Sequence, residues 1–273
     1  MIQLIADSGS TKTTWLLRDG VHPDVCLQTA GINPVRDTED TICSVVASLP
    51  QTAVSDLYFY GAGCIQPYSE TVSRVLRSAF PGANICVESD LLGAARALCG
   101  HDEGIACILG TGSNSCLYDG TRMVQNVSPL GWILGDEGSG AVLGRTLVGD
   151  LLKGQLPHSL LEAFLSRFHL TQASIIDAVY RQPQPNRFLA SLVPFLSEHR
   201  AEPGIHDLLL RQFRLFLARN VAAYQRRDLP VNCVGGVAYS FENELREAAS
   251  LEGFDVGVVN RSPMDGMARF HEF

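Results

Sequence analysis

Two short turns rich in Gly, Ser and Thr have a composition that suits phosphate binding. The first spans residues 7–12 and reads Asp-Ser-Gly-Ser-Thr-Lys, and the second spans residues 110–114 and reads Gly-Thr-Gly-Ser-Asn. Such a turn can aim several backbone N–H groups at one point, although ordinary hairpins use the same residues. The first is not a P-loop, because Thr11 stands where that motif has its second glycine. The recurrence favours a two-turn phosphate clamp, with the following predicted ligands: Ser8, Gly9, Ser10, Thr11, Lys12, Thr111, Gly112 and Ser113.

Three aspartates stand beside predicted turns or helix starts. Asp7 closes the first predicted strand, and its oxygens suit the hydrated Mg²⁺ that accompanies ATP; the ordinary alternative is an Asx-turn. Asp90 lies at a strand-to-helix junction, where an N-cap is the ordinary role and Ser89 could supply it equally well. Asp136 precedes a helix expected to begin near Gly138, where an acid could merely complement the helix dipole.

The elements that must position these residues alternate between strand and helix in the first part of the chain. The apolar and capping patterns predict strands at 2–6, 13–18, near 25–29, at 56–60 and at 84–88, and helices at 38–48, 68–80 and 90–99. The order is βββαβαβα, an antiparallel meander that leads into parallel crossovers.

The strand–turn–strand pattern restarts at residue 104. Strands are predicted at 104–109, 115–118 and 122–127, and helices from about 138 to 228, interrupted at Pro157, around residues 183–185 and at Pro203. A strand at 230–234, a Gly235-Gly236 turn, a helix at 239–251, a strand at 254–259 and a terminal helix at 264–271 complete the chain.

This repetition predicts a duplicated α/β fold of two lobes with a cleft between them. The first lobe is expected over residues 1–103, with a terminal segment 263–273 as its candidate completion. The second is expected over residues 104–262, with a helical insertion at about 138–228.

Composition excludes several functional classes. The net charge of −8 and the pI near 5.3 argue against a nucleic-acid partner. A membrane span, a targeting segment, an H-E-x-x-H zinc motif and a G-x-S-x-G hydrolase motif are not apparent. The eight cysteines form no C-x-x-C pair, which argues against zinc and iron–sulfur sites. We expect buried reduced thiols in a cytoplasmic protein.

Four motifs in order resemble the sugar kinase branch of the actin/Hsp70/hexokinase superfamily, and in particular N-acetylglucosamine kinases and the related BadF/BadG-type ATPases. They are DSGSTKT at residues 7–13, LGTGSN at 109–114, GWILGDEGS at 131–139 and VGGV at 234–237. The resemblance covers essentially the whole chain and implies actin-like (ribonuclease H-like) lobes. It also implies an enzyme that uses ATP with Mg²⁺, and a homodimer.

The resemblance assigns the catalytic role to Asp90, as the general base that takes the proton from the attacking sugar hydroxyl. It makes Asp136 a ligand of sugar hydroxyls. Trp132 would cover the apolar face of the sugar, although a core or lobe-interface position is its ordinary alternative.

Four further residues receive roles from the resemblance alone. Asn33 and Asn114 would contact the sugar, but Asn33 also suits a plain loop and Asn114 a turn with positive φ. Gly235 and Gly236 would let the backbone approach the adenine and ribose, although a helix-capping turn also explains two glycines.

The activity implied is ATP-dependent phosphorylation of a small-molecule amino sugar, with N-acetylglucosamine to its 6-phosphate placed first. A kinase for N-acetylmuramate or glucosamine is the alternative within the same chemistry. An ATPase that activates a partner enzyme and a non-catalytic sugar sensor are the alternatives of other classes.

Overall fold

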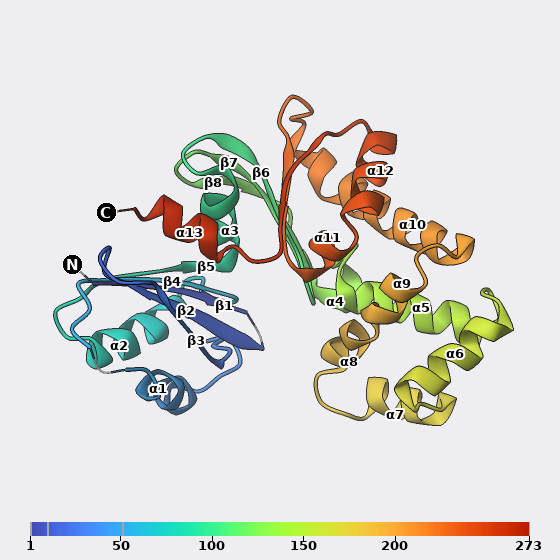
Figure 1. Ribbon diagram of the computed structural model, residues 1–273, viewed down its shortest axis with the longest axis horizontal. Helices are drawn as coiled ribbons and strands as arrows, with labels where there is room; N and C mark the ends of the chain where they lie inside the picture. Colours follow the sequence, from blue (N-terminus) through green and yellow to red (C-terminus); the bar gives the residue numbers. More distant parts are fainter. Residues whose placement is uncertain (1, 10, 51, 273) are drawn as a thin grey trace. The chain divides into compact units, whose positions relative to one another are not determined.

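The computed structural model describes residues 2–9, 11–50 and 52–272, which divide into two compact units (Figure 1). Unit 1 comprises the described residues of Met1–Glu103, Tyr118–Met123 and Ser262–Phe273. Unit 2 comprises Gly104–Leu117 and Val124–Arg261. The structure contains two five-stranded sheets, which confirms the predicted α/β class and its duplication.

The first sheet has the strand order β3-β2-β1-β4-β5. Its strands are β1 (Gln3–Ser8), β2 (Lys12–Arg18), β3 (Val25–Ala30), β4 (Asp56–Gly61) and β5 (Asn84–Ser89). β1 is antiparallel to β2 and parallel to β4, which is in turn parallel to β5. The carboxyl ends of β1, β4 and β5 therefore lie along one edge of the sheet.

Helices cover both faces of this sheet. Strand alternation places Leu4 and Ala6 in a core with α1 (Glu39–Ala47) and α2 (Ser69–Ala79). It places Ile5 on the other face, where α3 (Asp90–Cys99) and the terminal helix α13 (Met264–Phe270) pack. Thr38 caps α1 as predicted, by accepting a hydrogen bond from the N–H of Thr41.

The second sheet has the strand order β10-β9-β6-β7-β8. Its strands are β6 (Glu103–Leu109), β7 (Ser113–Asp119), β8 (Met123–Asn126), β9 (Val231–Val234) and β10 (Val256–Asn260). β9 pairs in parallel with both β10 and β6. The carboxyl ends of these three strands therefore share an edge, as in the first sheet.

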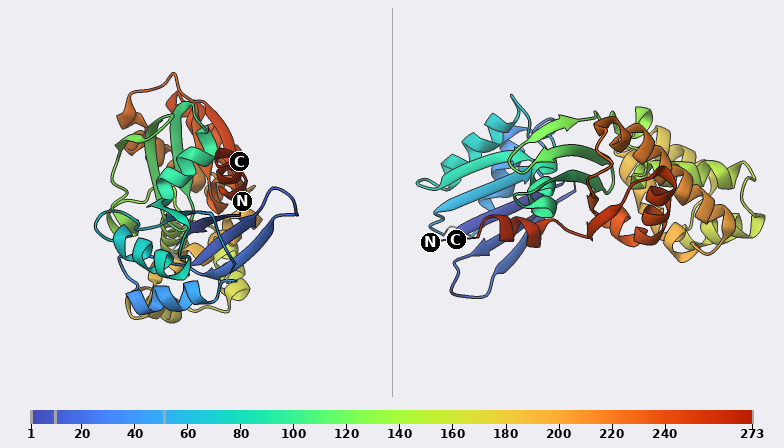
Figure 2. Two further views of the ribbon diagram at one scale, coloured as in Figure 1. Left: turned by 90° about the vertical axis from the view of Figure 1, so that its left-hand side faces the viewer. Right: turned by 90° about the horizontal axis from the view of Figure 1, so that it is seen from above.

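The remaining helices belong to unit 2 and gather together in the right-hand view of Figure 2. They are α4 (Gly131–Leu134), α5 (Gly140–Leu152), α6 (His158–Phe168), α7 (Gln172–Tyr180), α8 (Pro185–Ser191), α9 (Val193–Glu198), α10 (Pro203–Arg219), the 3₁₀ turn Val221–Tyr224, α11 (Gly236–Ser240) and α12 (Glu242–Glu252). Pro157 precedes α6, and Pro185 and Pro203 occupy first-turn positions of α8 and α10. The helical segment is interrupted at these prolines as predicted, and each proline stands at the start of a helix, where its missing N–H would have no intrahelical partner.

Three local features differ from what the sequence predicts. The short helix α4 was not predicted, because four residues carry no periodic signal. α11 already begins at Gly236, and α12 is separate from it. Cys26 and Cys43 are exposed, so the expectation of buried thiols holds only for some of the free cysteines.

Within the described part of the chain, no helix is both long enough and apolar enough to cross a bilayer.

Candidate active site

The first glycine-rich turn joins β1 to β2 in unit 1. The N–H of Gly9 donates to the carbonyl of Lys12 (3.0 Å), which closes the hairpin. The buried Ser8 hydroxyl contacts Thr13 Oγ1 (2.7 Å) and exchanges hydrogen bonds with the backbone of Ile32 (3.0 and 3.1 Å). The Ser8 hydroxyl is therefore already committed within unit 1, and the contact of Ser8 with phosphate stays a prediction.

Thr11 and Lys12 are exposed at the same turn, whereas Ser10, also predicted to bind phosphate, lies outside the described residues. The positive charge of Lys12 lowers the pKa of Asp7, because it favours the ionised carboxylate. The turn thus presents one cation beside one acid at the end of β1.

Asp7 and Asp90 meet at the carboxyl edge of the first sheet. The register aligns Ser8 with Gly61 of β4 and Ser89 of β5, so Asp90, the next residue, follows this row. The pKa of Asp7 is raised from 3.8 to about 6, first by burial and then by the charge of Asp90, against the opposing effect of Lys12. Two partly buried carboxylates that repel each other form a site that a cation would stabilise.

Asp90 is not required as the cap of α3. Ser89 supplies the N-cap, because its Oγ accepts from the N–H of Leu92 (3.2 Å). Asp90 instead stands at the first helical position, where its Oδ1 accepts from the N–H of Leu91 (2.9 Å). Burial raises the pKa of Asp90 from 3.8 to about 6, and the hydrogen bond from Leu91 opposes that rise. A carboxylate with such a pKa is ionised at neutral pH and is a better proton acceptor than an ordinary aspartate.

The second glycine-rich turn, between β6 and β7, is fastened to the start of α5 by backbone hydrogen bonds. Gly140 N–H donates to the carbonyl of Gly110 (2.8 Å), and Ala141 N–H donates to that of Thr111 (3.1 Å). Within the turn, Gly110 N–H donates to the carbonyl of Gly112 (2.9 Å). The peptide groups of the turn are therefore held in place by the helix that follows the GWILGDEGS motif.

The side chain of Asp136 also reaches this turn. Gly112 is so close to its carboxylate that an added Cβ would lie 3.1 Å from Asp136 Oδ2. Burial raises the pKa of Asp136 from 3.8 to about 6; the backbone N–H of Ser113 lowers it and the charge of Glu137 raises it.

The loop that carries Asp136 is held at both ends. Asp136 adopts a left-handed conformation (φ 53°), and its N–H donates to the carbonyl of Pro129 (2.9 Å). Its neighbour Glu137 is buried and pairs with Arg219 of α10 (2.9 Å). A non-glycine residue with positive φ is a position where local strain is often retained for function.

Trp132 lies in α4, on the same loop, and is partly buried against the unit 2 core. Its carbonyl accepts from Arg145 Nη1 (2.7 Å), while its neighbours Ile133 and Leu134 are 68% and 69% exposed. The core contact matches the ordinary alternative for this tryptophan, and its apolar neighbours lie open on the surface.

The two asparagines occupy different units. Asn33, in unit 1, forms an Asx-turn in which its Oδ1 accepts from the N–H of Val35 (3.1 Å). Asn114 belongs to strand β7 of unit 2 rather than to a turn, which corrects the expected position. Its Oδ1 accepts from Asn126 Nδ2 (2.9 Å) and from the N–H of Ser115 (2.9 Å).

Unit 2 contains a hollow of about 590 Å³ that begins at the second turn. Its lining combines three sequence neighbourhoods: Gly110, Thr111 and Gly140; Ala190, Val193, Pro194, Ser197 and Glu198; and Gly236, Val237, Ser240 and Phe241. Thr111 and Gly236 were predicted from sequence. The α8–α9 contribution was missed, because no motif marks it and only the folding of the helical insertion brings it to the turn.

Residue 235, directly before α11, must be a glycine. Its φ is 128°, and an added Cβ would overlap the backbone carbonyl of Leu109 at the end of β6. Glycine alone tolerates both the dihedral and the close approach. This contact keeps the start of α11 beside the second turn, and the hollow lies where the two meet.

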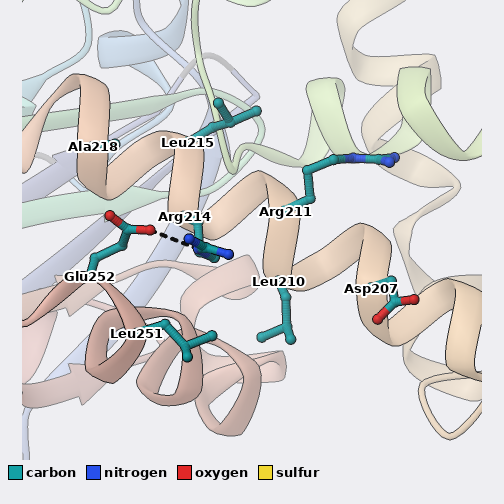
Figure 3. A pocket seen from close by; sticks show the side chains of 8 residues that line it. All are labelled: Asp207, Leu210, Arg211, Arg214, Leu215, Ala218, Leu251 and Glu252. Carbon is teal, nitrogen blue, oxygen red and sulfur yellow. Dashed lines mark hydrogen bonds and ion pairs between the residues drawn. The ribbon is translucent and has the colours of Figure 1, made fainter.

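A second hollow of unit 2, between α10 and α12, is not built for phosphate (Figure 3). Its two arginines are both neutralised by acids: Arg214 pairs with Glu252 (2.7 Å) and Arg211 with Asp150 (3.0 Å). Figure 3 shows the Arg214–Glu252 pair joining the two helices. These arginines stabilise the surface rather than offer free charge to an anion.

Neither a family model nor a curated protein matches the chain. Among solved structures, the chain is similar to a candidate N-acetylglucosamine kinase of Porphyromonas gingivalis, with 47% identity, 98% of each chain covered and a TM-score of 0.95.

Two more distant structures support the fold alone. A candidate N-acetylglucosamine kinase of Chromobacterium violaceum is 20% identical, with 99% of each chain covered and a TM-score of 0.73. A ROK family glucokinase of Streptomyces griseus, solved with glucose and AMPPNP, is 15% identical, with 98% of each chain covered and a TM-score of 0.55. Given the 47% identity of the first relative over nearly the whole length, the chain belongs to the N-acetylglucosamine kinase-like sugar kinases of the actin/Hsp70/hexokinase superfamily.

Proposed function

We propose that this protein transfers the γ-phosphoryl group of ATP to an amino sugar, with N-acetylglucosamine as the first candidate and its C6 hydroxyl as the acceptor. The observation that carries the proposal is the hollow of unit 2, which joins a glycine-rich turn to the start of α11. The 47% identical relative, itself described as a candidate N-acetylglucosamine kinase, supports the choice of sugar.

Unit 2 would hold the nucleotide. Val193, Val237 and Phe241 give the hollow an apolar wall suited to a purine, while Ser197 and Glu198 provide polar groups for the ribose hydroxyls. The turn that begins this hollow would bind phosphate oxygens through its backbone N–H groups.

Unit 1 would supply the catalytic carboxylate. As the sugar oxygen attacks the γ-phosphorus, the hydroxyl proton passes to Asp90, a new P–O bond forms to the sugar and the bond from phosphorus to the ADP oxygen breaks. Asp90 would act as the base with a pKa of about 6, which leaves it ionised at pH 7. Positioning and charge neutralisation provide the rest of the catalysis, as is general for phosphoryl transfer.

Asp7 would hold Mg²⁺, with the turn residues Thr11 and Lys12 facing the phosphates. The donor chemistry fits, because Mg²⁺ is commonly held by one or two carboxylates together with substrate phosphates and water. The pKa of Asp7 is raised first by burial and then by repulsion from Asp90, and a bound cation would relieve that repulsion. When bound, the ion would neutralise phosphate charge.

Asp136 would accept hydrogen bonds from sugar hydroxyls. Its partly buried carboxylate and its fixed left-handed backbone provide a rigid acceptor. Asn114 and Trp132 remain proposed sugar contacts on the same unit, and Asn33 remains one on unit 1. We also keep the homodimer and the cytoplasmic location as proposals; light scattering of the purified chain tests the first.

The deciding experiment measures ADP release from Mg·ATP without sugar and with N-acetylglucosamine, N-acetylmuramate, glucosamine or glucose. Strong stimulation by N-acetylglucosamine, with 6-phosphate identified by NMR, is the expected result. Stimulation by another sugar changes the acceptor but keeps the kinase. Sugar-independent release points to an ATPase that acts on a partner, and no release points to a sensor.

A further inference from the structure

The turn that follows β4, residues 61–64, lies at the carboxyl edge of the first sheet. The N–H of Ala62 donates to the carbonyl of Ser8 (2.8 Å), which ties this turn to the first glycine-rich turn. The strand register aligns Gly61 with Ser89, the N-cap of α3. Because β4 lies between β1 and β5 in the sheet, the turn after β4 lies between the first glycine-rich turn and the start of α3.

The loop that carries Asn33 meets the same edge and is held by its own hydrogen bonds. The N–H of Asn33 donates to Asp37 Oδ2 (2.7 Å), and its carbonyl accepts from the N–H groups of Arg36 and Asp37 (3.0 and 2.9 Å). Its Oδ1 accepts from the N–H of Val35 (3.1 Å). Within the described residues, Asn33 Nδ2 has no hydrogen-bond partner, so its two N–H groups are available to a ligand.

Gly63 packs directly against the carboxamide of Asn33. A Cβ added at residue 63 would lie 2.5 Å from Asn33 Oδ1, 3.1 Å from Asn33 Cγ and 3.0 Å from Val35 Cγ2. The φ of Gly63 is 78°, which glycine adopts without strain. Since the overlapping atoms belong to side chains rather than to the backbone, a larger residue at 63 would displace the Asn33 carboxamide and leave the turn itself in place.

We propose that Gly63 is a positioning residue for the acceptor, because it leaves the Asn33 carboxamide where its Nδ2 N–H groups donate to oxygen atoms of the sugar. This statement rests on the proposed function, in which Asn33 contacts the sugar. The Val35 N–H and the Gly63 backbone fix the carboxamide before a ligand arrives, which reduces the entropy lost on binding. The carboxylate of Asp90 only accepts hydrogen bonds, so unit 1 offers sugar hydroxyls both a donor and an acceptor.

The test compares Gly63→Ala with Gly82→Ala in steady-state kinetics with N-acetylglucosamine and Mg·ATP. Gly82 is the matched control, because it lies in the same unit with a φ of 97° and an added Cβ there would meet no atom within 4 Å. Both variants carry the strain of a positive φ, and only Gly63→Ala displaces the Asn33 carboxamide.

Gly63→Ala should raise the KM of the sugar about three- to tenfold, the loss expected for one neutral hydrogen bond. Its kcat and its KM for ATP should change by less than about twofold, because a contact that is equally strong in ground state and transition state affects the KM of the sugar alone. Gly82→Ala should leave all three constants at their wild-type values.

A double-mutant cycle separates positioning from a direct effect of residue 63 on the sugar. Asn33→Ala removes the carboxamide and should raise the KM of the sugar at least as much as Gly63→Ala does. Adding Gly63→Ala to Asn33→Ala should then change that KM by less than about twofold, because no carboxamide is left to displace. If the two effects multiply instead, Gly63 acts by another route and the proposal is overturned.

Urea unfolding of the same variants checks that they remain folded. The midpoint of Gly63→Ala should fall about as far as that of Gly82→Ala, because both share the backbone strain. Gly63→Asn adds a Cβ to a residue type that tolerates positive φ, and it should also raise the KM of the sugar.

The outcomes separate this proposal from the proposed function. A wild-type KM for the sugar in both Gly63 variants, or an equal rise in Gly82→Ala, overturns the role of Gly63 and leaves the kinase in place. If no sugar of the panel stimulates ADP release by the wild-type protein, the kinase proposal fails and the acceptor role of Gly63 fails with it.

Discussion

Replacing Asp90 by Asn should lower the turnover of the enzyme and raise the free energy of unfolding. Burial raises the pKa of Asp90 from 3.8 to about 6, so the folded protein holds an ionised carboxylate at neutral pH at a cost. One pKa unit corresponds to about 1.4 kcal/mol, and the cost at pH 7 is therefore at most about 3 kcal/mol. A neutral Asn avoids this cost.

The weaker, neutral hydrogen bond from Leu91 N–H to Asn does not reduce this gain further, because the effect of that bond is already included in the net pKa shift of Asp90. In addition, Asp7 loses the neighbouring charge that raises its own pKa and is destabilised less. We expect Asp90→Asn to unfold at pH 7 with a free energy about 1–3 kcal/mol above that of the wild type.

The sign of the pH dependence follows from proton uptake. Between about pH 4 and pH 6 the folded state binds more protons at Asp90 than the unfolded state, so wild-type stability falls as pH rises through this window. Below pH 4 the carboxyl is protonated in both states and the cost vanishes. The difference in free energy of unfolding between variant and wild type should therefore reach its full value above pH 6 and disappear near pH 4.

The assay is urea unfolding of the ligand-free protein at a series of pH values from 4 to 8, with a turnover measurement on the same preparations. Asp40→Asn, an exposed first-turn acid of α1, is the control and should change stability by less than about 1 kcal/mol. Turnover of Asp90→Asn should fall by about 10²- to 10⁴-fold, the range of general-base catalysis. An unfolding free energy that is lower at pH 7 and independent of pH would refute the reasoning.

Three other predictions follow from the site. Gly235→Ala should weaken Mg·AMPPNP binding and destabilise the fold by about 2 kcal/mol or more, because it combines a positive φ with an overlap on the Leu109 carbonyl; calorimetry and urea unfolding measure the two effects. Arg214→Ala should leave turnover unchanged and cost less than about 1 kcal/mol, because its ion pair with Glu252 is exposed; a large loss of turnover would make the α10–α12 hollow functional. In the wild type, kcat/KM should fall below about pH 6 as Asp90 becomes protonated, and a rate profile that stays flat to pH 5 would contradict its role as the base.

Local signals in the sequence were sufficient for most of the fold. β1, β4, β5 and α3 lie within about two residues of their predicted bounds, because apolar alternation, the Ser89 cap and the flanking turns are encoded in neighbouring residues. The sequence pattern did not predict α4 or the start of α11 at Gly236, because helices of four or five residues have too few turns to create a periodic pattern.

The sequence by itself determined which residues could do chemistry: two glycine-rich turns and three aspartates beside them, in an order typical of one superfamily. Only the tertiary structure decided how they are used. In the folded protein the Ser8 hydroxyl is hydrogen-bonded to the backbone of Ile32, and Asn114 lies in strand β7. Residues of α8 and α9 line the same hollow as the second turn. The tertiary structure also brought the carboxylate of Asp136 against Gly112 of the second turn. Such contacts depend on strand register and helix packing between distant segments, which no local pattern in the chain contains.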